Sequence, residues 1–211
     1  MEFEFRVCQN PECGLRFPMQ RGDRVGLRCP ICLGRTLVVA ERGVKREQDF
    51  QPEDRTNGIA VECVLDNVRS ALNVGSIFRT AEGYGLAHLY LGGITPTPES
   101  PRVRKTGLSA ERSVPWSAHR NTVELVSSLK SRGCSIWALE RTSASQPIEA
   151  ALAKRDSPGT RVLVVGNEQA GVDPGVLDLA DEVVHLDMRG RKQSFNVAVA
   201  FAIAAHVMAT K

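Results

Sequence analysis

The chain has 211 residues, 42% hydrophobic and 24% charged, which is typical of a globular protein with room for one α/β domain and a small module. The longest apolar run, 197–208, is too short to span a bilayer, so we expect no membrane partner. The segment Met1–Phe5 is unlike a signal peptide, and we expect a cytoplasmic protein. The net charge of +3 has its positive excess in residues 1–46, with nine basic and five acidic residues, which favours either a polyanionic partner or a solvated surface.

Four cysteines near the start of the chain follow the pattern C-x4-C-x15-C-x2-C. Gly14 and Gly34 permit tight turns that let two thiolates face one point. Four such sulfur ligands suit tetrahedral Zn²⁺ in a structural site without an open position. The alternative is a pair of disulfides, which a reducing cytosol disfavours. We therefore predict a zinc-ribbon-like module over residues 1–45, whose metal supplies its folding energy, with the ligands Cys8, Cys13, Cys29 and Cys32.

Residues 46–58 are polar, carry no apolar period and predict a linker. Beyond it, short apolar runs alternate with amphipathic stretches through residues 59–211. The apolar runs predict strands at 59–65, 88–91, 135–139, 162–165 and 182–186. The amphipathic stretches predict helices at 75–84, 121–132, 147–154 and 196–210, and a short helix that opens at Asp173. This alternation predicts an α/β domain with a mainly parallel sheet and helices on both faces.

Three short motifs lie at the ends of these elements, where a parallel sheet binds its ligands. They are NVGSIFR at 73–79, GNEQAG at 166–171 and SFNVAVA at 194–200. Each motif alone is weak evidence, because glycine turns and helix caps explain it as well as a ligand site does. The second motif is neither a dinucleotide fingerprint nor a P-loop, so it indicates no nicotinamide cofactor and no nucleoside triphosphate.

Side chains in these motifs allow two interpretations. Arg79 either binds a phosphate through its planar fork or pairs with Glu82 three residues later. Glu168 is either a pocket carboxylate or a helix-capping acid, while Ser194 and Asn196 either cap a helix or help to bind an anion. Two basic clusters either hold an RNA backbone or lie in solvated loops, namely Arg102, Arg104 and Lys105 and, before the third motif, Arg189, Arg191 and Lys192.

In this order, the three motifs resemble the signature motifs of the SpoU (TrmH-like) RNA methyltransferases of the SPOUT superfamily, over residues 59–211. The resemblance implies S-adenosyl-L-methionine as methyl donor and the ribose 2′-hydroxyl of a nucleotide in tRNA or rRNA as acceptor. It also implies a C-terminal trefoil knot, a homodimer with the active site near the dimer interface, and a substrate-side loop at 105–115. Two other functions stay open, which are methylation of guanine N1 and RNA binding or assembly without catalysis.

The resemblance further implies roles for single residues. Arg79 matches the catalytic arginine, and because arginine stays protonated we expect it to hold a phosphate and stabilise a developing alkoxide. The other catalytic matches are Asn73, Glu168, Ser194 and Asn196. The implied cofactor-binding residues are Leu139, Glu140, Gly166, Asn167, Gly171, Leu186, Met188, Ser194 and Phe195. Two positions depart from the family pattern, since Asp187 stands where proline is usual and Phe195 where leucine or methionine is usual.

Overall fold

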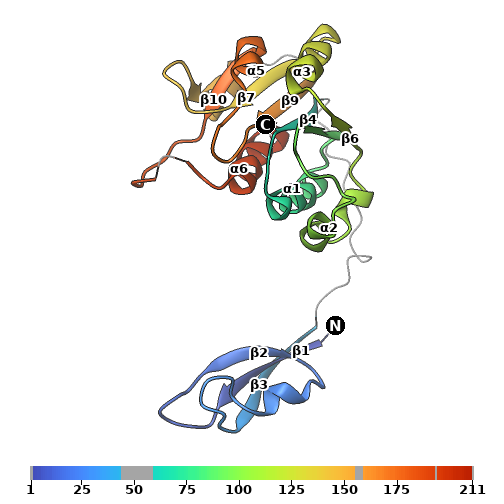
Figure 1. Cartoon of the computed structure of the whole chain (residues 1–211). Coiled ribbons are helices and arrows are strands. Elements are labelled where there is room, and N and C mark those ends of the chain that lie inside the picture. Colours follow the sequence, from blue (N-terminus) through green and yellow to red (C-terminus); the bar gives the residue numbers. More distant parts are fainter. Residues whose placement is uncertain (1, 44–58, 155–158, 193, 211) are drawn as a thin grey trace. The chain divides into compact units, whose positions relative to one another are not determined.

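The chain folds into two compact units, residues 1–55 and 56–211 (Figure 1). The computed structural model describes residues 2–43, 59–154, 159–192 and 194–210. The predicted linker at 46–58 lies outside these described residues.

The N-terminal unit is a three-stranded antiparallel sheet in the order β2-β1-β3, whose strands the sequence interpretation did not predict. Its elements are β1 (Glu2–Cys8), β2 (Arg16–Gln20), the 3₁₀ helix η1 (Arg24–Leu27) and β3 (Thr36–Gly43). Within the described part of this unit, Cys8 and Cys29 are the only buried residues of hydrophobic type. The sheet therefore has almost no hydrophobic core of its own.

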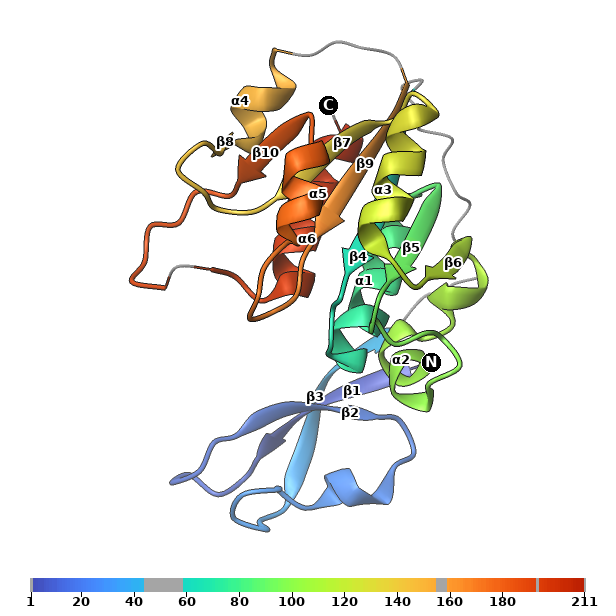
Figure 2. The same cartoon turned by 45° about the horizontal axis from the view of Figure 1, so that its top comes forward.

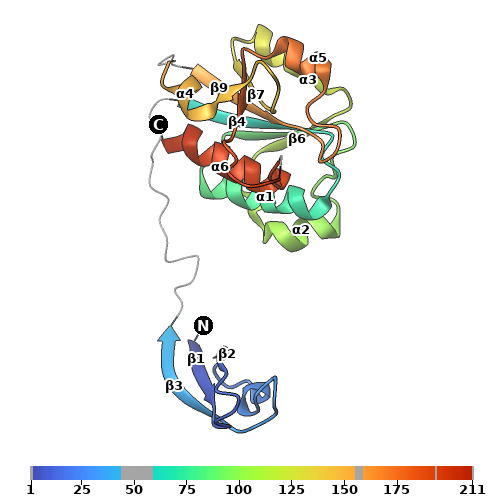
Figure 3. The same ribbon diagram turned by 90° about the vertical axis from the view of Figure 1, so that its left-hand side faces the viewer.

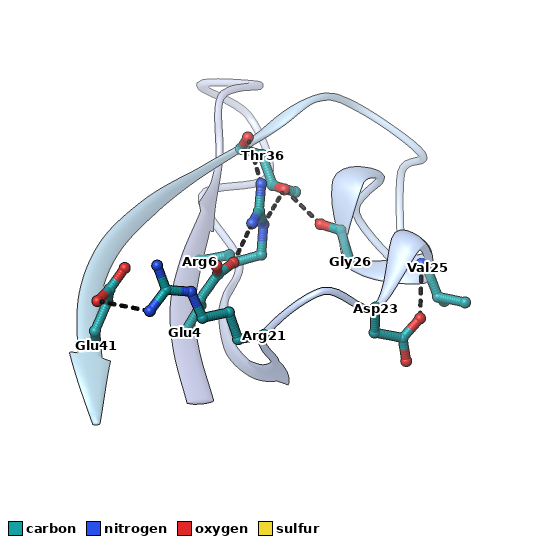
Figure 4. Close-up of polar contacts among 8 residues, drawn as sticks. All are labelled: Glu4, Arg6, Arg21, Asp23, Val25, Gly26, Thr36 and Glu41. Carbon is teal, nitrogen blue, oxygen red and sulfur yellow. Dashed lines mark hydrogen bonds and ion pairs between the residues drawn. The ribbon is translucent and has the colours of Figure 1, made fainter. Parts of the chain in front are cut away.

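Polar side chains hold the elements of this sheet together (Figure 4). Arg6 donates from Nε to the hydroxyl of Thr36 at 2.9 Å and forms an ion pair with Glu4 at 2.6 Å. The Thr36 hydroxyl donates to the carbonyl of Gly26 at 2.6 Å, so β3 is joined to the 3₁₀ turn. A unit with this little buried apolar surface needs a further source of folding energy.

The second unit contains a seven-stranded sheet in the order β6-β5-β4-β9-β7-β10-β8, and every neighbouring pair is parallel. The predicted mainly parallel sheet is therefore confirmed. Its central strands are rich in valine and leucine, as expected where helices cover both faces. The strands are β4 (Ile59–Asp66), β5 (His88–Gly92), β6 (Trp116–His119), β7 (Ser135–Leu139), β8 (Gln146–Pro147), β9 (Gly159–Val165) and β10 (Glu182–His185).

Helices cover both faces of this sheet (Figures 2 and 3). On one face α1, α4 and α6 enclose a core that includes Phe78 and Phe201, and α2 packs on α1. On the other face α3 and α5 enclose a second core that includes Val126 and Leu129. The helices are α1 (Ala71–Gly83), α2 (Pro101–Gly107), α3 (Thr122–Ser131), α4 (Ile148–Leu152), α5 (Pro174–Leu179) and α6 (Val197–Thr210), with a 3₁₀ helix η3 at Ala110–Arg112.

Capping residues set the helix starts. Asn121 accepts the N–H groups of Val123 and Glu124 at 3.0 and 3.2 Å, so the predicted cap of α3 is confirmed. Helix α1 begins four residues before its predicted start, because the hydroxyl of Ser70 accepts the N–H of Asn73. Strand β6 and helix α2 were not predicted, since each is too short to carry a clear hydrophobic period.

Helix α6 packs beside α1, where the rings of Tyr84 and His206 lie 5.6 Å apart between centroids. In the part of the chain that the structure describes, no helix is long and apolar enough to cross a membrane. The trefoil knot implied by the resemblance stays a prediction.

Candidate active site

The carboxyl ends of β7, β9 and β10 open onto a cavity of about 400 Å³. Its walls come from the loops that follow these strands and from the segment that enters α6. All nine residues implied as cofactor-binding line this cavity: Leu139, Glu140, Gly166, Asn167, Gly171, Leu186, Met188, Ser194 and Phe195. The structure brings these residues together from separate loops, while their role in binding stays a prediction.

Two glycines let the second motif fold back on the end of β9. A Cβ atom on Gly166 would lie closer than 3.0 Å to backbone atoms of Gly171 and Val172, so only glycine fits this approach. Gly171 has a φ of +76°, and a Cβ there would overlap the carboxylate of Glu140. Backbone hydrogen bonds join Asn167 and Gly171 in both directions, at 2.9 and 3.0 Å. The motif is thus a tight loop that presents backbone groups to the cavity.

Polar side chains fix the shape of this loop. The Oδ1 atom of Asn167 accepts the N–H groups of the second and third residues after it, at 2.9 and 3.0 Å. Its Nδ2 atom donates to the carbonyl of Asn67 at 2.7 Å, which joins the loop to the end of β4. Glu140, just after β7, accepts the N–H of Val172 at 3.0 Å. Three strand ends are therefore locked together around the cavity.

Side chains from all three motifs meet in one chain of hydrogen bonds. Glu168 accepts the N–H groups of Arg69 and Ser70 at 2.9 and 3.0 Å, and the Nδ2 atom of Asn73 at 3.0 Å. The Oδ1 atom of Asn73 in turn accepts Nδ2 of Asn196 at 3.1 Å, across 123 positions of sequence. Hydrogen bonds between motifs thus hold these side chains in place, so no single motif forms the network by itself.

The carboxyl group of Glu168 is held in its ionised form. Desolvation by the protein would raise its pKa, but the hydrogen bonds from Arg69, Ser70 and Asn73 outweigh that cost and lower the pKa below its usual range. The group also lies at the N-terminal end of α1, where the helix dipole favours negative charge. A lowered pKa makes Glu168 a poor proton acceptor near neutral pH, and its contacts fit the role of holding the motifs together.

Arg79 stands apart from this network. It lies on the exposed surface of α1, six residues or about 9 Å along the helix from Asn73, and does not line the cavity. Its guanidinium forms no hydrogen bond or ion pair with any residue that the structure describes, so the alternative pairing with Glu82 is absent. The five donors of this fork are available to a ligand.

The two basic clusters differ in how they are held. Arg104 donates from Nη1 to the carbonyls of Pro98 and Glu99, both at 2.8 Å, and so fixes the start of α2. Arg102 and Lys105 project from α2 as exposed side chains. The second cluster is exposed in the loop between β10 and α6, with Arg189, Arg191 and Lys192. Among the described residues, the five basic side chains other than Arg104 are exposed and form no hydrogen bond or ion pair.

Two polar residues of the cavity wall, both outside the three motifs, were missed by the sequence interpretation. Arg141 lines the cavity and donates to the carbonyl of Leu186 at 2.7 Å, joining the ends of β7 and β10. His185 also lines it, with Nδ1 at 2.8 Å from the hydroxyl of Ser145 and Nε2 at 3.5 Å from Asp187. The one signal for both residues was their position at the carboxyl end of a strand. The unusual Asp187 therefore pairs with a neighbour on the cavity wall.

The four N-terminal cysteines form a separate cluster in the N-terminal unit. Their sulfur atoms all lie within 4.8 Å of one another, with Cys8 and Cys32 at 3.4 Å and Cys13 and Cys29 at 3.7 Å. A tetrahedral zinc site with Zn–S bonds of about 2.3 Å places its sulfurs about 3.8 Å apart. A disulfide would need about 2.0 Å, and all four thiols are free. The cluster can hold a metal ion, and its all-sulfur donor set suits Zn²⁺.

Comparisons with known proteins agree with this geometry. The tRNA (guanosine(18)-2'-O)-methyltransferase of Aquifex aeolicus is 30% identical over 169 residues, which cover 79% of this chain and 75% of the relative. The 23S rRNA (guanosine(2553)-2'-O)-methyltransferase RlmP of Bacillus subtilis is 29% identical over 154 residues, which cover 72% of this chain and 59% of the relative. This chain therefore spans less than two thirds of the length of RlmP.

Among solved structures, the AdoMet-bound rRNA methyltransferase from Sinorhizobium meliloti is similar with a TM-score of 0.63 and 26% identity, over 76% of this chain and 58% of that one. A model of the SpoU rRNA Methylase family matches residues 60–206, which include all three motifs. The chain belongs to the SpoU rRNA Methylase family.

Proposed function

We propose that this protein transfers a methyl group from S-adenosyl-L-methionine to the ribose 2′-hydroxyl of a nucleotide in tRNA or rRNA. The observation that carries the proposal is one cavity beside one hydrogen-bonded network that unites the three motifs. The proposed boundaries are a zinc module at 1–45, a linker at 46–58 and a methyltransferase domain at 59–211.

The cavity fits the proposed donor in size and chemistry. Its volume of about 400 Å³ lies within the usual range for small-molecule pockets. When bound, S-adenosyl-L-methionine supplies an activated methyl group on sulfur. The backbone of Gly166 and the loops at Leu186 and Ser194 would hold it, since glycine turns and a helix start offer free backbone groups. Calorimetry with S-adenosyl-L-methionine tests this step, and absence of binding would favour the non-catalytic alternative.

Arg79 is proposed to act on the RNA and not on the donor. An arginine that stays protonated cannot serve as a general base, but its fork can hold a phosphate and stabilise a developing alkoxide. Positioning of the ribose against the methyl group supplies the rest of the acceleration. Arg79→Ala is expected to slow methylation by roughly a hundredfold or more with unchanged donor affinity. Arg79→Lys keeps the charge but loses the fork, so it restores the rate only in part.

If Arg79→Ala lowered the affinity for S-adenosyl-L-methionine as much as the rate of methylation, this assignment would be wrong. The site of transfer is tested separately by alkaline hydrolysis of the labelled RNA. A 2′-O-methyl group makes the adjacent linkage resistant to alkali, whereas methylation of guanine N1 leaves it sensitive. Mapping of 2′-O-methylation in RNA from a strain lacking this protein identifies the target nucleotide.

We further propose that the protein is a homodimer that pairs through α1 and α6. These helices lie side by side (Figure 3) and expose large apolar side chains, with Tyr84 39%, Val199 47% and Ile203 36% exposed. Such a patch is typical of a protein interface. Val199→Glu is expected to shift the sedimenting species from dimer to monomer, while Ser128→Glu on the exposed side of α3 is not. A wild-type protein that sediments as a monomer would contradict the proposal.

The N-terminal unit is proposed to bind zinc and to help select the RNA. Its support is the cysteine cluster and the positive excess of residues 1–46. Thiolates persist in a reducing compartment, so we place the protein in the cytoplasm. Removing residues 1–46 is expected to weaken RNA binding and to broaden target choice. Unchanged RNA affinity and target choice would limit the module to a structural role.

A further inference from the structure

A buried carboxylate lies outside the network of the three motifs. Glu111, on η3, is 8% exposed, and its Oε2 atom is shielded from solvent. This atom accepts no hydrogen bond from any residue in the described parts of the chain. Native proteins pair nearly all buried polar atoms, and an unpaired buried carboxylate is costly. Glu111 therefore lowers the stability of the isolated chain unless a donor reaches it.

The fold places this carboxylate against the helix that carries Arg79. Helices α1 and α2 cross at Gly75, where a Cβ atom would overlap Thr106 and lie 2.9 Å from the N atom of Gly107. A Cβ on Gly107 would lie 2.9 Å from Oε2 of Glu111. The two glycines thus let three segments approach closely, and η3 packs against both helices. The carboxylate sits at this crossing because Gly107 has no side chain to occupy its place.

The turn that leads into η3 is itself strained. Leu108 and Ser109 have φ values of 50° and 76°, so two consecutive non-glycine residues adopt the left-handed conformation. This conformation is unfavourable for residues with a Cβ atom, and such strain tends to cluster at functional sites. Burial of Leu108 does not compensate it, because that side chain is 56% exposed. Two unfavourable features, strain and an unpaired acid, therefore occur within four residues.

Arg79 is the donor best placed to reach Glu111. It lies one helical turn after Gly75 on nearly the same face of α1. A long helical side chain leans toward the helix N-terminus, over the residue four positions earlier. For Arg79 that residue is Gly75, where α1 meets α2 and η3 and where Gly107 lies between the Gly75 carbonyl and Oε2 of Glu111. We propose that Glu111 is a positioning residue, which holds the guanidinium of Arg79 for the RNA phosphate when RNA is bound.

The chemistry of the pair suits this role and rests on the proposed function. A carboxylate occupies two of the five donors of a guanidinium in a planar, bidentate contact. The remaining donors then point in fixed directions, so less side-chain entropy is lost when they bind phosphate. In the free chain no ion pair links the two groups within the described residues, so RNA binding would bring them together.

Glu111→Gln separates this proposal from a structural role because stability and activity should change in opposite directions. Neutralising an unpaired buried acid is expected to raise the midpoint of thermal unfolding by about 2–4 °C. The same variant should lower the rate of RNA methylation by roughly tenfold to a hundredfold, with unchanged affinity for S-adenosyl-L-methionine. Glu149→Gln, at an exposed position on α4, is the matched control and should change neither property.

A double-mutant cycle with Arg79→Ala decides whether Glu111 acts through Arg79. Rates are measured on total RNA from a strain lacking the protein, with radiolabelled S-adenosyl-L-methionine. If the pair works as one unit, the double variant is no slower than Arg79→Ala alone. Fully additive losses would overturn the proposal, as would a Glu111→Gln variant that methylates at the wild-type rate.

The oligomeric state of Glu111→Gln and the activity of the wild type provide two further tests. A Glu111→Gln protein that dissociates into monomers without loss of rate would place the missing donor on a second subunit and overturn the proposal. A wild-type protein that methylates no RNA would contradict the proposed function itself. In that case the cycle is read in RNA affinity, where the same non-additivity between Glu111 and Arg79 supports the pair and additivity overturns it.

Discussion

Replacing Gly166 by alanine tests whether the second motif needs close backbone approach. The new Cβ would lie closer than 3.0 Å to three backbone atoms, the carbonyl carbon and oxygen of Gly171 and the N atom of Val172. Ordinary contact begins at 3.4 Å, so the loop must open by about 1 Å at each atom. No flexible side chain is available to move aside. The two backbone hydrogen bonds between Asn167 and Gly171, at 2.9 and 3.0 Å, are therefore strained or lost.

The steric overlap and the weakened hydrogen bonds both lower the free energy of unfolding. Overpacking typically costs about 1–3 kcal/mol, and each weakened hydrogen bond adds about 0.5–1.5 kcal/mol. We expect Gly166→Ala to lower the free energy of unfolding by about 2–4 kcal/mol and the unfolding midpoint by about 5–15 °C. Because 1.4 kcal/mol corresponds to a factor of ten, affinity for S-adenosyl-L-methionine should fall about three- to tenfold if a third of this free energy is lost from binding.

The assay is thermal unfolding together with calorimetric titration of S-adenosyl-L-methionine. Gly83→Ala is the matched control, because nothing lies within 4 Å of its Cβ position and its φ is not positive. A helix-terminal Gly→Ala change of this kind should leave donor affinity unchanged and stability equal or slightly higher. If Gly166→Ala unfolds and binds like the wild type, the close approach of the loop to β9 is not a requirement of the site.

Three further predictions concern other parts of the molecule. A chelator should unfold residues 2–43 but not 59–210, since the N-terminal unit has little core, and amide exchange that stays protected in β1–β3 would contradict this. Glu168 has a lowered pKa, so the stability that its carboxylate adds is present above the usual value of 4.5 and is lost as pH falls through the lowered pKa. In urea unfolding, the difference in stability between the wild type and Glu168→Gln should therefore close in acid. A difference that persists at about pH 2 would refute this. Gly75→Ala should displace α2 and weaken RNA binding while sparing donor binding, and equal losses in a titration of both ligands would refute the separation.

Local patterns in the sequence were sufficient for several features. The alternation of apolar and amphipathic stretches predicted the parallel sheet, because burial on both faces demands continuous apolar strands. Cysteine spacing predicted a cluster that can hold a metal, because two tight turns bring four thiols to one point. Asn121 predicted the start of α3 through a contact with its own neighbours. Each of these signals acts over a few residues.

The sequence failed where local signals were weak or competed. The strands β1 and β2 alternate polar and apolar residues, as in EFEFRV at 2–7 and RFPMQ at 16–20, but the cysteine pattern of the same segment directed the interpretation to turns. The early start of α1 depends on the hydroxyl of Ser70, whereas the prediction began the helix at Gly75. Arg141 and His185 line the cavity only because β7 and β10 end side by side, and neither residue belongs to a motif.

By itself the sequence determined the class of fold and the cysteine cluster, since periodicity and turn glycines are properties of neighbouring residues, and its resemblance to the SpoU family pointed to nine residues that line the cavity. The tertiary structure alone decided how these residues act on one another. It joined Asn73 to Asn196 across 123 positions, gave Glu168 a lowered pKa, and left Glu111 buried without a donor. The physical reason is that hydrogen bonding, desolvation and steric approach depend on distances in space, which the order of residues along the chain does not specify.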